Sequence, residues 1–380
     1  MPALNDASLM PISFTSPPPR DTGYDVAIVG GGPAGATCAA FCAAGGLRTL
    51  LLEREIFPRE KVCGDCLNPS AWPVLDRLGI ADAVRAQPSS PLRSVEFVGT
   101  DGASIVHSLP ETGHGEIGIR RSVLDAVLLA TAKSRGVDVR EDSAVERIER
   151  KGDGWTIESG TRTFLARTIV AADGRNSTIA RMLGILPKPG RERVALQTHF
   201  RAPEDFGERV VMRFLPWGYC GLASVGDGLL NLCLVARPEN LASLRAWAID
   251  HFRLPASQTW RSITPLSRSP VVPAQKGLLL VGDAARVVEP FTGEGIFYAL
   301  ASAELAARHL LAGDLQDYTR SHSRLYRGRL WVNQLARLAC LHPRLAALLL
   351  RIARTWPGTL RWLTRKVVVG NAHDPSLSLR

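Results

Sequence analysis

The sequence predicts an α/β chain in which a parallel-sheet unit closes around an inserted antiparallel sheet and is followed by a basic helical segment. Three observations support this fold class. A buried apolar run at 24–29 leads through a glycine-rich turn into a helix and a second strand at 49–52, which makes a β-α-β unit. Residues 194–235 alternate between apolar and polar positions, as antiparallel strands do. A buried run at 277–281 and a helical stretch at 293–311 then return to the first pattern.

Composition and charge narrow the class further. The chain has 380 residues and a net charge of +10, with 46% hydrophobic and 22% charged residues, which excludes a disordered, collagen-like or coiled-coil protein. The charge is local, because residues 318–373 contain ten Arg, one Lys and no acidic residue. That segment carries +11 and the rest sums to −1. Because the sequence contains no nucleic-acid-binding motif, we do not expect nucleic-acid binding.

Further elements follow in order along the chain. We expect a helix at 122–135, a hairpin around Gly152–Gly154, a buried strand at 168–172 and a helix near 241–252. The predicted domains are a flexible tail (1–22), a first part of the cofactor domain (23–189), an antiparallel substrate domain (190–271), a second part of the cofactor domain (272–315) and a basic helical segment (316–380).

The N-terminal stretch and the lengths of the apolar runs indicate where in the cell we expect the protein. Residues 1–22 contain three consecutive prolines and lack the basic and apolar regions of a signal peptide. No apolar run approaches the ~20 residues that a transmembrane helix needs. We therefore expect a cytoplasmic protein, either free or peripheral on the inner face of the membrane.

The glycine-rich turn carries a dinucleotide-binding fingerprint. Residues 30–35 read G-G-G-P-A-G, between a strand and a helix, and Glu53 follows Gly35 by 18 residues. Gly30 suits a tight turn, Gly32 lets the backbone approach a pyrophosphate at the helix N-terminus, and Gly35 lets helix and strand pack closely. Glu53 is placed to accept hydrogen bonds from a ribose diol.

Three later signals favour FAD over NAD. An R-x-x-L-D element starts at Arg121, and two buried strands end at Asp173 and Asp283, where a carboxylate can bind a ribityl hydroxyl. Thr292–Ile296 reads T-G-E-G-I and opens a helix. The N-terminus of such a helix can stabilise negative charge on a reduced flavin ring.

With these motifs, residues 24–311 resemble the FAD-dependent geranylgeranyl reductase family, within the superfamily of aromatic hydroxylases and flavin halogenases. Arg59–Asp65 is similar to the reductases' K-x-C-G-(G/D) loop, and Thr292–Ile296 matches their T-G-E-G-I. The resemblance implies a glutathione-reductase-like FAD domain with a sheet that roofs the flavin. The candidate cofactor-binding residues are Gly30, Gly32, Ala34, Gly35, Glu53, Arg54, Gly64, Asp65, Leu67, Arg121, Val145, Asp173, Asp283, Gly293, Gly295 and Ile296.

The chain departs from this family in the stretch expected to line the substrate cavity. Reductases carry G-Y-x-W-x-F-P, whereas residues 218–224 read G-Y-C-G-L-A-S, which predicts a wider pocket or one filled from elsewhere. The halogenases' W-x-W-x-I-P is absent. Three functions therefore stay open: reduction of a C=C bond in a prenyl or lipid-like substrate, hydroxylation of a lipid-like aromatic or polyketide substrate, and a non-catalytic membrane-associated flavoprotein. No NAD(P)H domain is visible, so NAD(P)H docks transiently or a protein donates electrons.

Candidate catalytic residues are few. Cys63 is expected near the flavin ring, with a redox-active pair with Cys66 or plain packing as alternatives. Tyr219 and Trp217 are candidates for substrate contact or for the core. His199 shares a strand face with Gln197, and we expect that face to meet solvent rather than act as a pocket acid or base. The cysteine and histidine spacings predict no metal site.

The basic C-terminal segment has leucines at helical spacing and three tryptophans, Trp331, Trp356 and Trp362. Pro343 and Pro357 are expected to start helices. Short amphipathic helices with arginine on one side suit an anionic membrane surface, and the alternative is helices packed on the body with a solvated arginine face.

Overall fold

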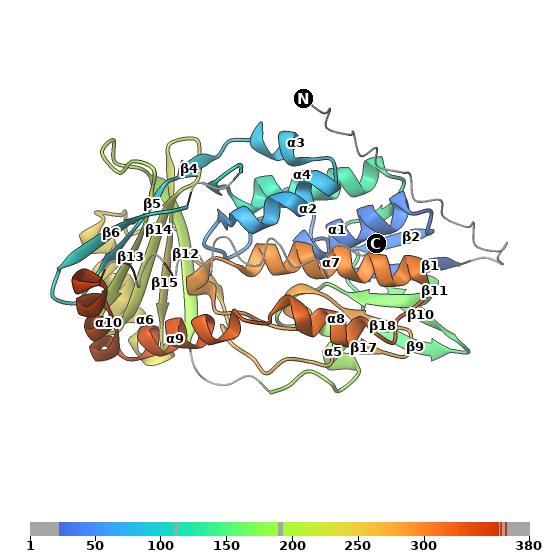
Figure 1. Cartoon of the computed structure of the whole chain (residues 1–380). Helices are drawn as coiled ribbons and strands as arrows, with labels where there is room; N and C mark the ends of the chain where they lie inside the picture. The colour runs from blue at the N-terminus through green and yellow to red at the C-terminus, as the bar shows by residue number, and fades with distance from the viewer. Residues whose placement is uncertain (1–22, 111–112, 189–192, 357, 359–361, 363–380) are drawn as a thin grey trace, which may run out of the picture.

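The computed structural model describes residues 23–110, 113–188, 193–356, 358 and 362, and Figure 1 shows their arrangement. A large sheet with helices lies at one end of the molecule, and a second sheet with three helices lies at the other. The expectations for the tail at 1–22 and for a helix start at Pro357 concern residues outside this range.

An eight-stranded sheet forms the centre of the first region. Its path runs β17-β18-β11-β1-β2-β8, with β10 paired to β11 and β9 to β10. The neighbours β1, β2, β8, β11 and β18 are parallel, as the buried apolar runs predicted. The strands are β1 (Tyr24–Val29), β2 (Thr49–Leu52), β8 (Asp138–Arg140), β9 (Arg147–Lys151), β10 (Gly154–Ser159), β11 (Arg162–Ala171), β17 (Ala274–Gln275) and β18 (Leu278–Leu280).

Small side chains let helices pack tightly on this sheet. Helix α1 (Pro33–Ala44) contains six Ala, two Cys and one Gly, and nine of its twelve residues are buried. It lies between α4 (Arg121–Ser134) and α7 (Gly295–Ala312), and these three helices with the sheet enclose the main hydrophobic core. Shorter helices complete the region: α2 (Trp72–Arg77), α3 (Ala81–Arg85) and α5 (Thr178–Met182).

A seven-stranded sheet forms the second region, in the order β16-β12-β15-β14-β13-β5-β6. Its four central strands lie within residues 194–236, where the alternating pattern predicted strands. Helix α6 (Leu241–His251) packs on β15. The strands are β5 (Ser94–Val98), β6 (Ser104–Ser108), β12 (Val194–Arg201), β13 (Arg209–Leu215), β14 (Gly218–Ser224), β15 (Leu229–Ala236) and β16 (Arg261–Ile263).

The predicted boundary of the second domain at residue 190 is wrong in one respect. Residues 94–108, assigned from sequence to the first domain, supply β5 and β6 of the second sheet. Strand β5 pairs with β13 in parallel, so the sheet is mixed rather than antiparallel. The chain therefore crosses between the two regions more often than a simple insertion requires.

Two smaller parts join the regions. A three-stranded sheet of β3 (Cys66–Leu67), β7 (Glu116–Gly118) and β4 (Ser90–Leu92) lies between them. The C-terminal helices α8 (Tyr318–Leu325), α9 (Leu330–Leu341) and α10 (Pro343–Thr355) run from α7 across to the seven-stranded sheet (Figure 1). Pro343 starts α10 as predicted. Within the described residues, no helix combines the length and the apolar character needed to cross a bilayer.

Candidate functional site

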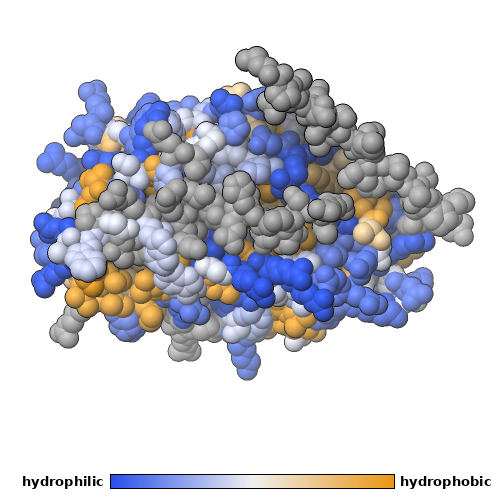
Figure 2. Space-filling model, in the orientation of Figure 1, coloured by the Kyte–Doolittle hydropathy of each residue, from blue (hydrophilic) through white to orange (hydrophobic). Residues whose placement is uncertain are grey.

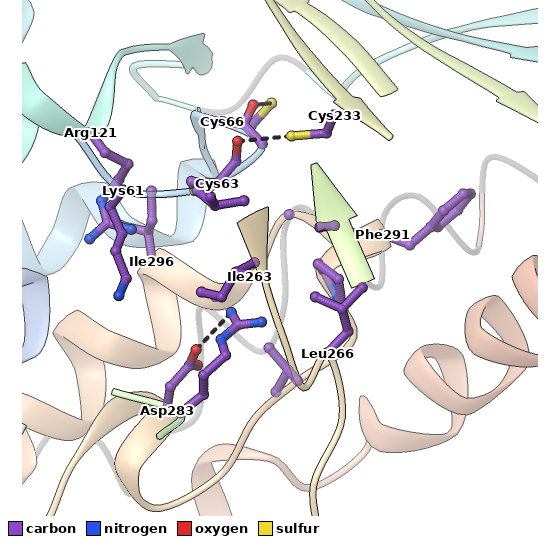
Figure 3. Close-up of a pocket in the computed structure, with 18 of the residues that line it drawn as sticks. Lys61, Cys63, Cys66, Arg121, Cys233, Ile263, Leu266, Asp283, Phe291 and Ile296 are labelled. Carbon is purple, nitrogen blue, oxygen red and sulfur yellow. Dashed lines mark hydrogen bonds and ion pairs between the residues drawn. The ribbon is translucent and has the colours of Figure 1, made fainter. Parts of the chain in front are cut away.

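A cavity of about 1230 Å³ lies where the two large sheets, the three-stranded sheet and the C-terminal helices meet. In Figure 3, Arg121 and Lys61 lie at one side of it beside Ile296, and Phe291 lies at the other. These sequence-predicted residues line it: Gly30, Gly32, Ala34, Glu53, Arg54, Cys63, Gly64, Arg121, Val145, Asp173, Tyr219, Asp283, Gly293, Gly295 and Ile296.

The glycine-rich turn opens α1 onto the cavity. Gly30 has a φ of +105°, which L-residues with side chains rarely adopt. A Cβ on Gly35 would lie 1.7 Å from the carbonyl oxygen of Gly30, so Gly35 has the packing role expected of it and does not line the cavity. Gly32 is the N-cap and no side chain caps the helix, which leaves its positive end available to an anion.

Glu53 holds the turn from the end of β2. Its Oε2 accepts a hydrogen bond from the backbone N–H of Gly31 at 2.6 Å, and its Oε1 accepts one from Glu55 at 2.9 Å. Each carboxylate oxygen has two lone pairs, so both retain capacity for a hydroxyl donor. The acid at this spacing therefore has the position that a ribose diol requires.

Charged side chains gather at this part of the cavity. Arg121 donates two hydrogen bonds of 2.7 Å to Asp125, which also accepts one from Arg59 at 2.9 Å. Arg175 donates to Asp283 at 2.9 Å. We call this part the charged end, and it is lined by Glu53, Arg54, Arg59, Lys61, Arg121, Arg175 and Asp283.

Lys61 is the cation at the charged end with no recorded hydrogen bond or ion pair within the described residues. Burial and, after it, the positive charges of Arg59 and Arg121 together lower its pKa to about 8. A desolvated cation surrounded by cations is unfavourable alone. The site therefore presents positive charge that an anionic ligand would relieve.

The Cys63–Cys66 loop is pinned beneath the seven-stranded sheet. The carbonyl oxygen of Cys63 accepts hydrogen bonds from Gln197 at 2.8 Å and Asn231 at 2.9 Å. Both thiols line the cavity and are free, and burial raises the pKa of each. Protonated thiols are poor nucleophiles, which disfavours a redox-active pair.

The structure corrects the expectation for His199. Its Nε2 lies 2.8 Å from Oδ2 of Asp65, which is fully buried and also accepts a hydrogen bond from Gln197. The Gln197 and His199 side chains of β12 thus lie against the loop, with Gln197 buried and the His199 side chain 13% exposed. The Asp65 and Leu67 side chains point away from the cavity, Asp65 into this cluster and Leu67 into the core.

The strand ends predicted as flavin contacts have distinct roles. Asp173 lies at the cavity wall, but its Oδ2 accepts hydrogen bonds from the backbone N–H groups of Thr178 and Ile179 at 2.6 and 3.1 Å, so it fixes the start of α5.

The turn that opens α7 contains two glycines that line the cavity. Gly293 has a φ of +68°, and a Cβ on Gly295 would meet open space. This turn therefore offers bare backbone and the N-terminus of α7 to a ligand.

Glu294, inside the same turn, faces away from the cavity. It is fully buried and accepts hydrogen bonds from Arg329 Nη1 and from Asn333 Nδ2, both at 3.0 Å. Arg329 directly precedes α9 and Asn333 lies within it. The turn that lines the charged end is therefore anchored to the C-terminal helices.

Beyond the charged end the cavity becomes apolar. The ring of Phe291 lies 5.4 Å from Tyr219, edge to face, and 5.7 Å from Phe214. Gly221 and Ala223 line the wall here, but Trp217 does not. We call this part the apolar chamber, lined by Val95, Phe97, Leu109, Val210, Met212, Phe214, Tyr219, Phe291, Leu335, Ala339, Ala346, Leu349, Leu350, Ile352 and Ala353.

Sequence reasoning missed much of this chamber. The C-terminal helices contribute Leu335, Ala339 and Leu349 to its wall, so they pack on the body as one of the two alternatives held. Phe291 directly precedes the T-G-E-G-I motif, and this position next to a predicted flavin contact could have marked it as a cavity residue. Glu116 lines the cavity as well, and no motif marks it.

The residues present fit FAD on structural grounds. Bare glycine backbone lies at two helix N-termini, an acid is held at the end of β2, and an uncompensated Lys61 faces the same space. Pyrophosphate, ribose and a flavin edge each have a complementary group there.

Comparisons with known proteins agree with this geometry. A sequence model of the FAD binding domain family matches residues 23–215. Conditioned medium factor receptor 1 of Dictyostelium discoideum is 30% identical over 80% of this chain, which spans 66% of that protein. A menaquinone reductase of Mycobacterium tuberculosis is 30% identical, with 78% of each chain covered. A digeranylgeranylglycerophospholipid reductase of Methanosphaerula palustris is 29% identical, with 76% of each covered.

Solved structures share the fold. The flavin-dependent brominase Bmp2 superposes with a TM-score of 0.76 over 93% of this chain and 95% of that one. The two sequences are 21% identical, so this likeness concerns the fold alone.

Proposed function

Because the chain belongs to the FAD binding domain family, we propose that it is a flavin-dependent reductase that saturates a carbon–carbon double bond of a prenyl or lipid-like substrate. It is an FAD-dependent enzyme, and the relatives named above include reductases of menaquinone and of a digeranylgeranyl lipid. Electrons reach the cofactor from NAD(P)H or from a protein donor.

The apolar chamber is the observation that carries this proposal. None of the residues that define it is charged, and its aromatic members surround Phe291. Burying hydrocarbon in such a space is favourable by about 25 cal/mol per Å² of apolar surface. A substrate with a long hydrocarbon part gains most from the chamber, whereas a small polar substrate would leave it unfilled.

The side chains at the charged end position the cofactor. Bound FAD supplies hydride once it is reduced, and the protein supplies orientation and electrostatics. Arg121 is held rigid by Asp125, and the N-terminus of α7 with Lys61 favours negative charge in the cavity. The apolar chamber excludes water from the reacting carbon.

Turnover without oxygen tests the proposal. Purified protein reduced anaerobically should convert a prenylated quinone or a geranylgeranyl lipid to a product heavier by two hydrogens, detected by mass spectrometry. Product that forms only with oxygen and gains one oxygen atom would instead establish hydroxylation. Protein without a flavin absorption spectrum would overturn both functions.

The exposed side of the C-terminal helices suits an anionic membrane surface, and we include this surface in the proposal. Large apolar side chains stand exposed there, over the area that is partly orange at the lower left of Figure 2. Arg337, Arg351 and Arg354 lie on the same helices, and no acidic residue occurs from 318 to 373. The exposed apolar residues are Trp331, Leu338, Leu348, Ile352, Trp356 and Trp362.

This surface adjoins the apolar chamber. Ile352 is 43% exposed and also lines the cavity, so one side chain of α10 borders both. A hydrocarbon chain would then pass from a bilayer into the chamber without crossing water. We place the enzyme on the inner face of the membrane on this basis.

Vesicle sedimentation tests the membrane surface. The full chain should sediment with vesicles containing phosphatidylglycerol and less with pure phosphatidylcholine, because arginine attracts anionic lipid. Leu348→Ser with Trp356→Ser should weaken sedimentation at least about tenfold. The matched control is Val272→Ser, at an apolar residue that is 60% exposed outside the C-terminal helices. Equal sedimentation of the wild type, the double variant and the Val272→Ser control would contradict the proposal that this surface binds the membrane.

A further inference from the structure

Glu116, the first residue of β7, faces the cavity from the three-stranded sheet. Side chains alternate along a strand, and the next residue, Ile117, packs into the main core. Gly118, on the same face as Glu116, approaches β14 so closely that a Cβ there would lie 1.8 Å from the carbonyl oxygen of Ser224. The face of β7 that carries Glu116 is therefore turned toward the seven-stranded sheet.

Cys66 links Glu116 to the turn at the charged end. Strand β3, which begins at Cys66, pairs with β7, and a negative charge on Glu116 raises the pKa of the Cys66 thiol. The Cβ of Cys66 lies 4.0 Å from the position a Cβ would take on Gly293. Glu116 therefore lines the cavity from the strand next to Cys66, on the side where Cys66 approaches the Gly293 turn.

The surroundings of Glu116 favour its neutral form. Within the described residues no hydrogen bond or ion pair is recorded for its carboxyl group, and Leu92 lies opposite on β4. Burial raises the pKa of Glu116 to about 7. The Cys66 thiol is a titratable group on the neighbouring strand, and His114, two residues before Glu116, pairs with Asp76.

We propose that Glu116 is the proton donor that completes reduction of the substrate's double bond, an inference that rests on the proposed reductase function. Addition of hydride, supplied by reduced FAD, to one carbon sends the π electron pair to the neighbouring carbon. That carbon takes the proton of the Glu116 carboxyl group, and the carboxylate then takes a proton from water. The double bond gains one hydride and one proton, and the cofactor is oxidised by two electrons.

Other acids at the cavity serve this step less well. Burial raises the pKa of the Cys66 and Cys233 thiols and of the Tyr219 phenol well above their ordinary values, so each gives up a proton reluctantly. A donor whose pKa lies near the working pH transfers protons most effectively. Glu116 meets that condition from the three-stranded sheet, whereas Lys61, with a pKa of about 8, lies among the cations of the charged end.

Two variants with their matched control test the role of Glu116. Glu116→Gln keeps the size of the side chain and removes its proton, so anaerobic turnover should fall about 10²- to 10⁴-fold while FAD content is kept. Glu116→Asp should retain part of the activity. Glu149→Gln, at an exposed acid of β9, should behave as wild type. Wild-type turnover should decline above pH 7, because the donor then loses its proton, and Glu116→Gln should lack this decline.

A second readout does not depend on turnover. Infrared difference spectra of the full chain should show a protonated carboxyl band that titrates near pH 7 in wild type and is missing in Glu116→Gln. Reduction at an unchanged rate in Glu116→Gln, or a band that titrates below about pH 5.5, would overturn the proton donor and leave the reductase function standing. Wild-type protein that only hydroxylates its substrate would overturn both.

Discussion

The two ends of the cavity are built differently. The charged end has seven ionisable residues, several locked in ion pairs, and it is formed by turns that directly follow strands. The apolar chamber has no charged residue and is formed by the second sheet, Phe291 and the C-terminal helices. A cofactor such as FAD needs polar contacts at fixed positions, whereas a hydrocarbon substrate needs only a cavity of matching shape from which water is excluded. The chamber is therefore free to vary between relatives that use the same cofactor.

The largest effect expected on the charged end comes from Gly35→Ala. The added Cβ would lie 1.7 Å from the Gly30 carbonyl oxygen, a backbone atom that cannot yield without moving β1 or α1. We expect the free energy of unfolding to fall by about 4 kcal/mol or more, with loss of bound FAD. Gly358→Ala, where the Cβ would meet open space, is the control. Urea denaturation measures the free energy of unfolding, and flavin absorbance measures the FAD content. A Gly35→Ala protein with wild-type stability and bound FAD would contradict this account of the turn.

The anchor between the two ends should give the next largest effect. Glu294→Leu leaves Arg329 buried without its partner, which costs about 3–5 kcal/mol. Replacing both Glu294 and Arg329 with leucine should recover much of the stability lost in Glu294→Leu. Hydrogen exchange should rise in α9 for the single variant. As a control, breaking the exposed Arg93–Glu208 pair should cost about 0–1 kcal/mol, and equal losses at the two pairs would show that the anchor is unimportant.

A substitution in the apolar chamber should separate substrate binding from cofactor binding. Gly221→Phe adds a ring to a wall where even an added Cβ would lie 3.3 Å from the Met212 sulfur. We expect turnover of long-chain substrates to fall about 10- to 100-fold, with short-chain substrates and FAD content spared. Gly221→Ala is the control, because the flexible Met212 side chain can move. Loss of FAD in Gly221→Phe would mean that the two ends are not independent.

The smallest effect concerns Lys61. Its native pKa of about 8 is below the unfolded value of 10.5, so the unfolded chain binds more protons between pH 8 and 10.5. The stability of FAD-free protein should therefore rise with pH across that window. Lys61→Met should remove this rise, stabilise the FAD-free protein at pH 7 by about 1–3 kcal/mol and weaken FAD binding. Lys276→Met, at an 82% exposed lysine, should change neither quantity.

The same contrast explains what could be predicted from the sequence. The charged end follows from local motifs, because each glycine and acid there acts within a single strand-to-helix turn. The pairing of β5 with β13 could not be predicted from the sequence, because the paired residues are more than 100 positions apart. Alternation in β12 showed that Gln197 and His199 share a face but not which face is buried. Glu116 stands in a three-residue strand without a motif, so only the folded chain reveals its position.

The anchoring of α9 by Glu294 also has a consequence for biosynthesis. The chamber wall that α9 and α10 supply is the last of the described elements to leave the ribosome. At about 5–20 residues per second, synthesis leaves the chamber open for a few seconds after α7 is complete. During that interval the nascent chain exposes the aromatic side of its second sheet, and Glu294 lacks Arg329. The residues that surround the cofactor are thus synthesised before the helices that close the apolar chamber.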